Sequence, residues 1–369
     1  MELAETLEEA RFEVHLVDGE GGPYVCKQEV TAELRSLVDG AVTRASGIQN
    51  DITPATYTVS YQPTIRGRHE LSVKVNGTQL PGSPFDVFVR QPPSLLGQPV
   101  RTIEGLKDVH RIAVSNCGEL VVTQSEYLGE TGRLSLLNKD GHIIKGVDSI
   151  QTDTSEYKLN PCGVAVDSKG NIYVTDGTTQ GLMKFDSNLQ LAKLCGGHGD
   201  KPGQFAFPDG IALSQDDMLF VCDWGNHRIQ IFTTDLKFVS CFGSYGSGEG
   251  KFKYPCDLSF DDAGNLYIVD EYKLCVQVFS GSGTFLRSFW KDGSRSHGLL
   301  SSRSIHVDHD HVYVTEGKGG QVSVFHTSGI FIGSFGQLLL WPVSIATNQD
   351  GFVFVSDDAY DGSGHLYVF

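Results

Sequence analysis

The sequence predicts an all-β protein, in which an immunoglobulin-like β-sandwich is followed by a six-bladed β-propeller. Three observations lead to this prediction. The 369 residues include 43 Gly and are 40% hydrophobic, a composition that favours many short strands joined by turns. A segment with the spacing of four strands recurs from Val109 to the end of the chain. The residues before it alternate apolar and polar side chains without that repeat.

The charge of the chain argues against nucleic-acid binding. There are 45 acidic and 29 basic residues, a formal net charge of −16. Residues 98–369 alone hold 32 acidic and 21 basic residues, a net charge of −11, so neither part of the chain is basic. Such a field repels phosphate backbones unless basic groups are concentrated locally.

The sequence offers no membrane segment and no cofactor motif. No stretch approaches the roughly 20 apolar residues that a membrane span needs, and the acidic first residues lack the apolar core of a signal peptide. We therefore expect a cytoplasmic protein without a membrane partner. The eight cysteines are scattered and form no C-x-x-C pair, which argues against zinc modules and disulfide scaffolds. No metal and no cofactor are expected.

The first part of the chain contains the predicted sandwich. Residues 1–10 are interpreted as an N-terminal stump, with the end of a coiled-coil helix as one interpretation. Residues 11–91 contain alternating runs such as Arg11-FEVHLV, Ala55-TYTVSYQP and Glu70-LSVKVNG, the pattern of strands with one buried face. The Pro-containing stretch at 92–98 is predicted to be a short linker.

The propeller is predicted over residues 99–369. Three segments align without gaps, beginning at Asn160, Phe207 and Tyr254, and their prolines lie 47 residues apart. Further copies begin at Val109, Ser302 and Pro342, which gives six. Each copy consists of four predicted strands separated by turns with Gly, Asn and Asp. Four strands in about 40 to 50 residues is typical of a propeller blade.

The sixth copy ends at Phe369, at the end of its third strand. The segment 99–103 resembles the fourth strand of other copies, such as Phe285-LRSF, and has no partner in its own unit. We predict that it completes the sixth blade. Pairing the two ends of the repeat region in one sheet would remove exposed strand edges and lock the ring.

A carboxylate recurs after the second strand of five copies, at Asp176, Asp223, Asp270, Glu316 and Asp357. A ring of carboxylates could in principle bind a metal or act in catalysis. However, every blade needs a group at this place that accepts backbone N–H bonds and holds the turn into the third strand. The structural interpretation is therefore favoured.

Three histidines lie close together in the fifth copy, at His306, His309 and His311. Successive side chains of a strand point to opposite faces of the sheet, so these histidines are expected to lie in different environments. A shared tetrahedral zinc site is therefore not expected. The sequence contains no serine-nucleophile elbow, zincin motif or phosphate-binding loop. It therefore nominates no catalytic residue.

Two sets of variable positions are expected to meet at one end of the propeller, where the first strands begin and the loops between second and third strands open. Arg111 and Arg303 are expected to anchor a ligand as cations. Trp224 and Tyr272 would do so as aromatic groups, with Asp209 setting specificity. The candidate ligand-binding residues are His110, Arg111, Cys162, Asp209, Trp224, Asn226, Cys256, Tyr272, Lys273, Arg303, Lys318 and Val343.

Two segments resemble known repeat families. Asp223-WGNHRIQIF, after Pro208-DGIAL, resembles the NHL repeat, whose Asn-His-Leu motif is here Asn226-His227-Arg228. The segment from Ala55 onward, with the later turn Pro81-GSPF, resembles a filamin-type immunoglobulin repeat. A filamin repeat followed by six NHL repeats is similar to the C-terminal architecture of tripartite-motif NHL proteins.

In that family, a RING with ubiquitin-ligase activity, B-boxes and a self-associating coiled coil precede these domains. None of them is found in this sequence, so the resemblance implies a non-catalytic target-recognition region. Relatives bind proteins or RNA stem-loops through the propeller, which makes a protein target the favoured partner and an RNA stem-loop the alternative. A metal-dependent lyase or lactonase on a similar propeller is the rival from another functional class.

Overall fold

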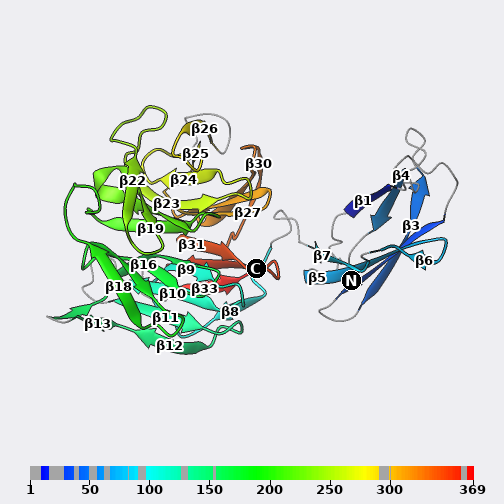
Figure 1. Cartoon of the computed structure of the whole chain (residues 1–369), viewed down its shortest axis with the longest axis horizontal. Coiled ribbons are helices and arrows are strands. Elements are labelled where there is room, and N and C mark those ends of the chain that lie inside the picture. Colours follow the sequence, from blue (N-terminus) through cyan, green and yellow to red (C-terminus); the bar gives the residue numbers. More distant parts are fainter. Residues whose placement is uncertain are drawn as a thin grey trace. The chain divides into compact units, whose positions relative to one another are not determined.

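The computed structural model describes residues 10–15, 29–36, 41–49, 56–61, 67–81, 83–89, 97–125, 132–152, 155–290, 299, 301–358 and 364–369. The chain divides into two compact units, Met1–Leu95 and Leu96–Phe369 (Figure 1). Both units are built from strands, which confirms the predicted all-β fold class. Within these residues, the structure has no helix with the length and apolar character that crossing a bilayer requires.

In the first unit, antiparallel strands form one connected array in the order β1-β4-β3-β2-β5-β6, and β7 also pairs with β5. Alternate residues of one strand, such as Val30, Ala32 and Leu34, are buried in its core. The strands are β1 (Ala10–His15), β2 (Val30–Ser36), β3 (Val42–Gln49), β4 (Thr56–Tyr61), β5 (Gly67–Val75), β6 (Thr78–Gln79) and β7 (Phe85–Val89). Of the predicted stump only Ala10 is described, as the first residue of β1, and of the predicted linker only Gly97 and Gln98.

The described part of the second unit forms six four-stranded antiparallel sheets, the blades of a propeller. Blade 1 consists of β9 (Val109–Val114), β10 (Leu120–Ser125), β11 (Gly132–Leu137) and β12 (Ile143–Val147), and blade 2 of β15 (Pro161–Val166), β16 (Ile172–Asp176), β17 (Gly181–Phe185) and β18 (Leu191–Gly196). Blade 3 consists of β19 (Pro208–Leu213), β20 (Met218–Asp223), β21 (Arg228–Thr233) and β22 (Phe238–Phe242), and blade 4 of β23 (Pro255–Phe260), β24 (Leu266–Asp270), β25 (Val276–Phe279) and β26 (Phe285–Phe289).

Blade 5 consists of β27 (Ser302–Asp308), β28 (His311–Glu316), β29 (Gln321–His326) and β30 (Phe331–Phe335). Blade 6 consists of β31 (Pro342–Thr347), β32 (Val353–Asp357), β33 (His365–Val368) and β8 (Arg101–Ile103). A hairpin of β13 (Ser149–Gln151) and β14 (Glu156–Lys158) lies between blades 1 and 2, and a short 3-10 turn, η2 (Trp224–Asn226), follows β20.

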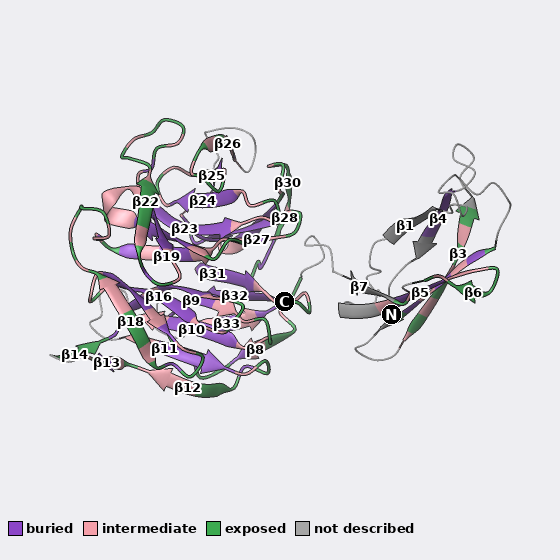
Figure 2. Cartoon of the chain, in the orientation of Figure 1, coloured by how far each residue is buried: buried purple, intermediate pink, exposed green. Residues whose placement is uncertain are grey.

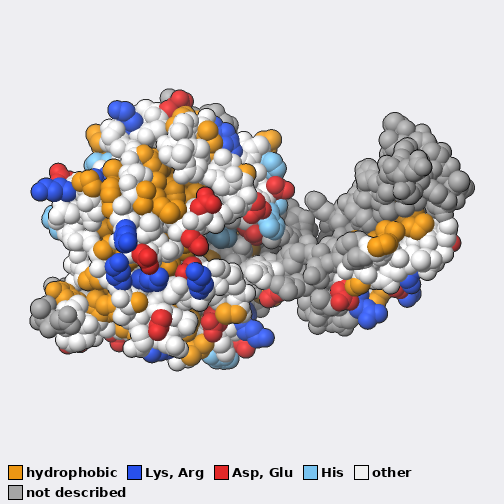
Figure 3. Space-filling model, in the orientation of Figure 1, with side chains coloured by type: hydrophobic (Ala, Val, Ile, Leu, Met, Phe, Trp, Pro, Cys, Tyr) orange, Lys and Arg blue, Asp and Glu red, His pale blue; other side chains and the backbone are white. Residues whose placement is uncertain are grey.

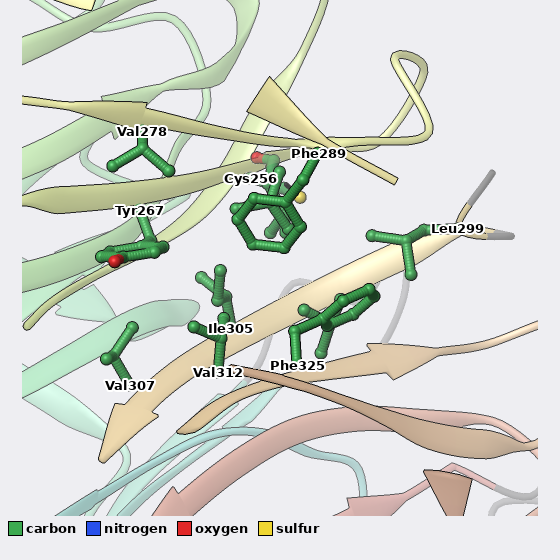
Figure 4. Close-up of a cluster of buried hydrophobic side chains, with 12 residues drawn as sticks. Cys256, Tyr267, Val278, Phe289, Leu299, Ile305, Val307, Val312 and Phe325 are labelled. Carbon is green, nitrogen blue, oxygen red and sulfur yellow. Dashed lines mark hydrogen bonds between the residues drawn. The ribbon is translucent and has the colours of Figure 1, made fainter. Parts of the chain in front are cut away.

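The first strands of the blades surround the propeller axis and contact one another in a closed ring, β9-β15-β19-β23-β27-β31 and back to β9. The inner strands of the blades are largely buried (Figure 2), and apolar side chains of adjacent blades pack together in shared clusters. Between blades 4 and 5, Tyr267 and Val278 pack with Ile305 and Phe325 in one cluster (Figure 4). Each sheet therefore contributes apolar side chains to both of its neighbours, as the alternation of side chains along a strand allows.

The sixth blade takes its fourth strand from the beginning of the propeller unit. β33 pairs antiparallel with β8, with Val368 opposite Arg101. The Arg101 guanidinium also donates to the carbonyls of Lys139 and Asp140 in blade 1, at 3.0 and 3.2 Å. The two ends of the repeat region lie in one sheet, so β33 has a partner on both sides and β8 becomes the outer strand of the blade.

A basic side chain in the outer strand of four blades reaches the next blade. Each one donates to a backbone carbonyl in the turn between the third and fourth strands of the following blade, and all four occupy the same register position. The pairs are Lys145 with Asn188, Lys193 with Asp235, Arg287 with Thr327, and Arg101 with Lys139 and Asp140. The equivalent residues in blades 3 and 5 are Ser240 and Gly333.

The repeated carboxylate has the structural role predicted for it. Asp176 accepts the backbone N–H of Asn160 at 2.7 Å and that of Thr179 at 2.8 Å. The first bond holds the segment that enters the first strand, and the second holds the turn into the third strand. Asp223, Asp270 and Asp357 likewise accept an N–H of the entering segment, from Ala206, Lys253 and Trp341. These hydrogen bonds offset the cost of burying the carboxylates.

Candidate functional site

One end of the propeller gathers the segments that enter the first strands and the loops that join the second and third strands. The proline that opens a first strand pairs with the carboxylate that ends the second strand, so the residues on either side of this pair lie together. The pairs are Pro161 with Asp176, Pro208 with Asp223, Pro255 with Asp270 and Pro342 with Asp357. We call this end of the propeller the top face.

The first strands are irregular just below the top face. Their pairing with the second strands shifts register within the first few residues, for example between Pro161 and Val164 and between Pro208 and Ile211. Such bulges turn side chains out of the directions that they would have in a regularly paired strand. The residues that line the axis at this level are Arg111, Gly163, Asp257, Ser304 and Ser344. In blade 3 the equivalent residue is Gly210, which lies against Asp257.

Arg111 closes the axis of the propeller. Its side chain is 4% exposed, and Nη2 donates to the Asp209 carboxylate at 3.1 Å. Nη2 also donates to the carbonyls of Cys256 and Arg303, at 3.2 and 3.0 Å. These three partners occupy the same position in blades 3, 4 and 5, so one guanidinium ties blade 1 to three other blades. The expectation that Arg111 anchors a ligand is therefore corrected, because its side chain is directed inward to the axis.

Asp257 is another charged group on the axis, and it is not among the candidate residues predicted from the sequence. Its Oδ2 lies 3.7 Å from Arg111 Nε and accepts the Ser304 hydroxyl at 2.6 Å and the Ile305 N–H at 3.1 Å. A signal was present, because the equivalent position holds Gly or Ser in the other four copies. Because Arg111 and Asp257 carry opposite charges at a position that is Gly or Ser in the other blades, an ion pair between them across the ring could have been predicted.

Burial and opposite charge compete in this cluster. Burial opposes the charge on Arg111, but Asp209 and Asp257 more than offset it, and the pKa of Arg111 is raised. Burial also raises the pKa of Asp209 and of Asp257, while Arg111 opposes that rise. The guanidinium therefore stays charged, and the two carboxylates depend on it.

Below the guanidinium, the first strands of all six blades line a cavity of about 290 Å³. Much of its wall is aliphatic, with Ala113, Ala165, Ala212 and Ala346 in equivalent positions. Since Arg111 stands at the end of this cavity nearest the top face, the top face is closed at the axis. A ligand of the top face would therefore lie on the surface, in contact with the loops.

The two candidate thiols are not activated for nucleophilic chemistry. Cys256 is buried and donates to the Ser302 carbonyl at 3.4 Å, whereas Cys162 is half-buried. Burial raises the pKa of both thiols, so both remain protonated near neutral pH. The expectation that Cys256 contacts a ligand is corrected, because the packing of blade 5 covers it.

His110 lies beside Arg111, with Nδ1 3.3 Å from the Cys162 carbonyl. Burial, helped by the positive charges of Arg111 and Arg303, lowers the pKa of His110 to about 3. This folded value lies below the ordinary value of about 6.5. The stabilising effect of neutral His110 is therefore fully present above pH 6.5 and is lost as the pH falls toward 3.

We therefore expect the free energy of unfolding of the wild type to fall more steeply than that of His110→Gln as the pH drops from 6.5 to 4. The upper limit of this difference is about 1.4 kcal/mol per pH unit, and the solvent contact that the ring retains reduces it. Urea unfolding at several pH values measures the two slopes. Parallel profiles for the two proteins would show that His110 is not held neutral by its surroundings.

Lys273 and Asn226 hold loops of the top face. Nζ of Lys273 donates to the carbonyls of Gly248 and Lys251, at 2.7 and 2.8 Å, in the segment that enters blade 4. Nδ2 of Asn226 donates to the Gly199 carbonyl at 2.9 Å, in the segment that enters blade 3. These polar groups are used within the fold, which makes them weaker candidates for direct ligand contact.

The remaining candidates differ in their accessibility. Val343 is buried, whereas Lys318 is exposed. Arg303 and Asp209 are half-buried, and Arg303 has the Glu271 carboxylate 3.8 Å away. On the side of the propeller seen in Figure 3, basic side chains lie among acidic ones.

Four aromatic rings form a continuous row across the top of blades 3 and 4. Phe207 and Tyr254 directly precede the first strands, and Trp224 and Tyr272 follow the second strands. Their centroids lie 6.2 Å apart from Phe207 to Trp224, 4.2 Å from Trp224 to Tyr254 and 5.1 Å from Tyr254 to Tyr272. Phe207 and Tyr272, at the two ends, are 60% and 56% exposed. We call these four residues the aromatic row.

Half of the aromatic row was missed by the sequence analysis. The signal was the residue before the blade proline, which is Phe207, Tyr254 and Trp341 in blades 3, 4 and 6. Phe207 also has a left-handed backbone, with φ of +53°, which is costly for a bulky side chain. Its N–H is held by Gln180 Oε1 at 2.5 Å. Backbone strain of this kind concentrates at functional positions.

Within the described residues, no three His, Cys, Asp or Glu side chains are arranged to hold a metal ion. His306 and His309 lie in different environments, as the alternation predicted. His306 Nε2 is 3.0 Å from Thr347 Oγ1, and His309 Nδ1 is 2.8 Å from Asp262 Oδ2.

Comparison with known families identifies two repeats. A family model described as the Filamin/ABP280 repeat matches residues 2–86, and the NHL repeat model matches residues 205–232. The chain contains a filamin repeat and an NHL repeat. The first match begins before the predicted boundary at residue 11, and the second covers the aromatic row from Phe207 to Trp224. No curated protein sequence matches the chain.

Solved structures share the propeller architecture at low sequence identity. A streptogramin B lyase is 16% identical and has a TM-score of 0.51, covering 73% of this chain and 97% of its own. A structural genomics protein of unknown function from Bacteroides thetaiotaomicron is 16% identical, with a TM-score of 0.56 and coverage of 92% and 90%. A catalytically inactive virginiamycin B lyase from Staphylococcus aureus with quinupristin is 13% identical, with a TM-score of 0.51 and coverage of 98% and 99%. These likenesses show the fold alone.

Proposed function

We propose that this chain is the target-recognition part of a ubiquitin ligase of the tripartite-motif class, is itself non-catalytic, and binds a protein through the top face of its propeller. The observation that carries this proposal is the aromatic row. Tyr and Trp side chains are enriched at the energetically dominant positions of protein interfaces. The filamin and NHL repeats support the class of protein.

Three further features favour a protein over an RNA stem-loop. Leu338 and Leu340, in the segment that enters blade 6, are 66% and 64% exposed on the same face, and aliphatic side chains do not stack on bases as aromatic and Arg side chains do. Lys273 and Arg111, which could have met phosphates, donate to carbonyls within the propeller. The net charge of −11 for residues 98–369 also opposes phosphate binding.

Substitutions at the exposed ends of the aromatic row should weaken target binding while leaving the fold intact. Tyr272→Ala removes one ring. Phe207→Asn removes the other and keeps the backbone, because Asn adopts the left-handed conformation more readily than Phe. Each should cost about 2 kcal/mol, or roughly 30-fold in affinity, if the ring is an interface anchor. Ile144→Ala is the matched control, because it removes an exposed apolar side chain from the outer strand β12.

The experiment selects ligands from two pools on the purified chain: displayed protein fragments, and RNA stem-loops with random loops at two salt concentrations. Calorimetry then measures each selected ligand against the three variants. Fragments that lose affinity in the Tyr272 and Phe207 variants, but not in the Ile144 variant, support the proposal. A defined RNA loop whose affinity falls steeply with salt would assign RNA as the ligand. Fragments insensitive to all three substitutions would exclude the aromatic row as their site.

A further inference from the structure

The cavity on the propeller axis, which we call the axial cavity, has a polar end. Arg111 lines this end and is 4% exposed. Nη1 and Nη2 of its guanidinium donate to oxygens of the ring of first strands. Among the described residues, Nε has no hydrogen-bond acceptor, and Asp257 Oδ2 lies 3.7 Å from it. Because a buried N–H without an acceptor is costly, this end of the cavity favours a molecule that brings one.

The two sides of the axial cavity differ in polarity. At its middle level, blades 4 and 5 contribute Ser259 and His306. His306 Nε2 lies 3.0 Å from Oγ1 of Thr347, which also lines the cavity. The other blades contribute alanines at the position of His306: Ala113, Ala165, Ala212 and Ala346. One side of the cavity is therefore aliphatic, and the other carries hydrogen-bonding groups.

The axial cavity is reached from the end of the propeller opposite the top face. There its lining consists of the last residues of the first strands, of which Val114, Val166, Leu213 and Phe260 are half-buried and keep contact with solvent. The volume of about 290 Å³ is the space of roughly ten water molecules. It lies at the lower limit for ligand pockets, so only a small ligand fits.

We propose that the axial cavity binds a small neutral polyol, of the size of a monosaccharide or a cyclitol. A hydroxyl group both accepts and donates hydrogen bonds. One hydroxyl can therefore accept from Arg111 Nε and donate to Asp257 Oδ2. A second hydroxyl can meet that of Thr347, which has capacity for a ligand besides His306. The C–H groups of the ligand would lie against the alanines and Phe260.

Charge selects a neutral ligand over an ionic one. Arg111 and Asp257 lie side by side at the closed end of the cavity, so a cation would meet the guanidinium and an anion would meet the carboxylate. Either ion would be buried without a counter-charge of its own, which is costly. The net charge of −11 for residues 98–369 also repels anions.

Calorimetry on the whole chain with a panel of small ligands tests this inference. The panel contains glycerol, xylose, glucose and myo-inositol, with glucosamine and gluconate as charged analogues. We expect saturable binding of at least one neutral member and none of the charged ones. The same ligand should raise the unfolding temperature as a binding ligand does. Sugars excluded from protein surfaces also stabilise proteins, but they do so without saturation and equally in all variants.

Two variants remove polar groups from the cavity wall. His306→Ala and Thr347→Val introduce residues that equivalent positions of other blades already carry, such as Ala113 and Val114, so the propeller should remain folded. Each should weaken polyol binding roughly tenfold through the loss of hydrogen bonds. His309→Ala is the matched control, because this histidine of the same blade is 61% exposed and pairs with Asp262.

Thermal unfolding without ligand shows whether each variant is folded. Weaker binding in the two cavity variants, with the affinity of His309→Ala unchanged, would support the axial site. Three outcomes would overturn it: no saturable binding by any neutral member, stronger binding of a charged analogue, or affinity that neither cavity variant alters. The result does not depend on target binding by the top face, which the ligand selection measures separately.

Discussion

Replacing Arg111 by Met is expected to lower the free energy of unfolding by about 3 to 5 kcal/mol, the cost of leaving buried charges without their partner. Met preserves most of the apolar volume of the side chain, so little of this loss is due to a cavity. The variant leaves the Asp209 carboxylate without a donor that lies 3.1 Å away in the native protein, and Asp257 without its counter-charge. It also removes the donors to two blade carbonyls. Urea unfolding at pH 7 measures the loss.

The pH dependence of this variant separates lost charge pairing from lost packing. Without the guanidinium, burial raises the pKa of Asp209 and Asp257 further. A carboxyl with a raised folded pKa contributes stability that is present below its unfolded pKa, near 4, and is lost as the pH rises. The deficit of Arg111→Met should therefore be larger at pH 7 than at pH 4.

Neutralising both carboxylates provides the corresponding rescue. Adding Asp209→Asn and Asp257→Asn to Arg111→Met removes the two uncompensated buried charges, so part of the stability at pH 7 should return. The excess pH dependence should also disappear. A deficit of equal size at pH 4 and pH 7, with no recovery in the triple variant, would mean that Arg111 acts through packing alone.

The second large loss of stability is expected for a substitution at Gly210, where the first strand of blade 3 lies against that of blade 4 at the axis. A Cβ at this position would lie 2.4 Å from Asp257 Oδ1 and 2.6 Å from Asp257 Cα. Gly210→Ala must therefore displace the backbone of β23 and disturb the hydrogen bonds of Asp257 to Ser304 and Ile305. We expect a loss of about 3 kcal/mol in the free energy of unfolding, typical of strong overpacking.

Gly333→Ala is the matched control for this substitution, because both glycines lie in strands and only Gly210 has close neighbours. Its stability should stay within about 0.5 kcal/mol of the wild type. Thermal and urea unfolding of the two variants measure the contrast. Equal stability of the two alanine variants would show that the first strands can separate at the axis without cost.

The candidate site was only partly predictable from the sequence. The loop position of Trp224 and Tyr272 follows from aligning the repeats, and both residues do lie on the top face. Their incorporation into a row with Phe207 and Tyr254 depends on how adjacent blades pack, and the rings come from positions up to 65 residues apart. Arg111 was expected at the surface, because its position next to His110 resembles a loop entrance. The bulges of the first strands turn it inward instead.

The sequence by itself determined the strands and their order. Apolar residues at every second position specify strands with buried faces, and the repeat of about 47 residues specifies blades that pack against one another. It also determined the carboxylate that ends each second strand, whose hydrogen bonds are local to one blade. Only the tertiary structure decided which polar side chains reach solvent. The partners of Arg111 lie 98 to 192 residues away in sequence, and such pairing depends on closing the ring, which no local pattern encodes.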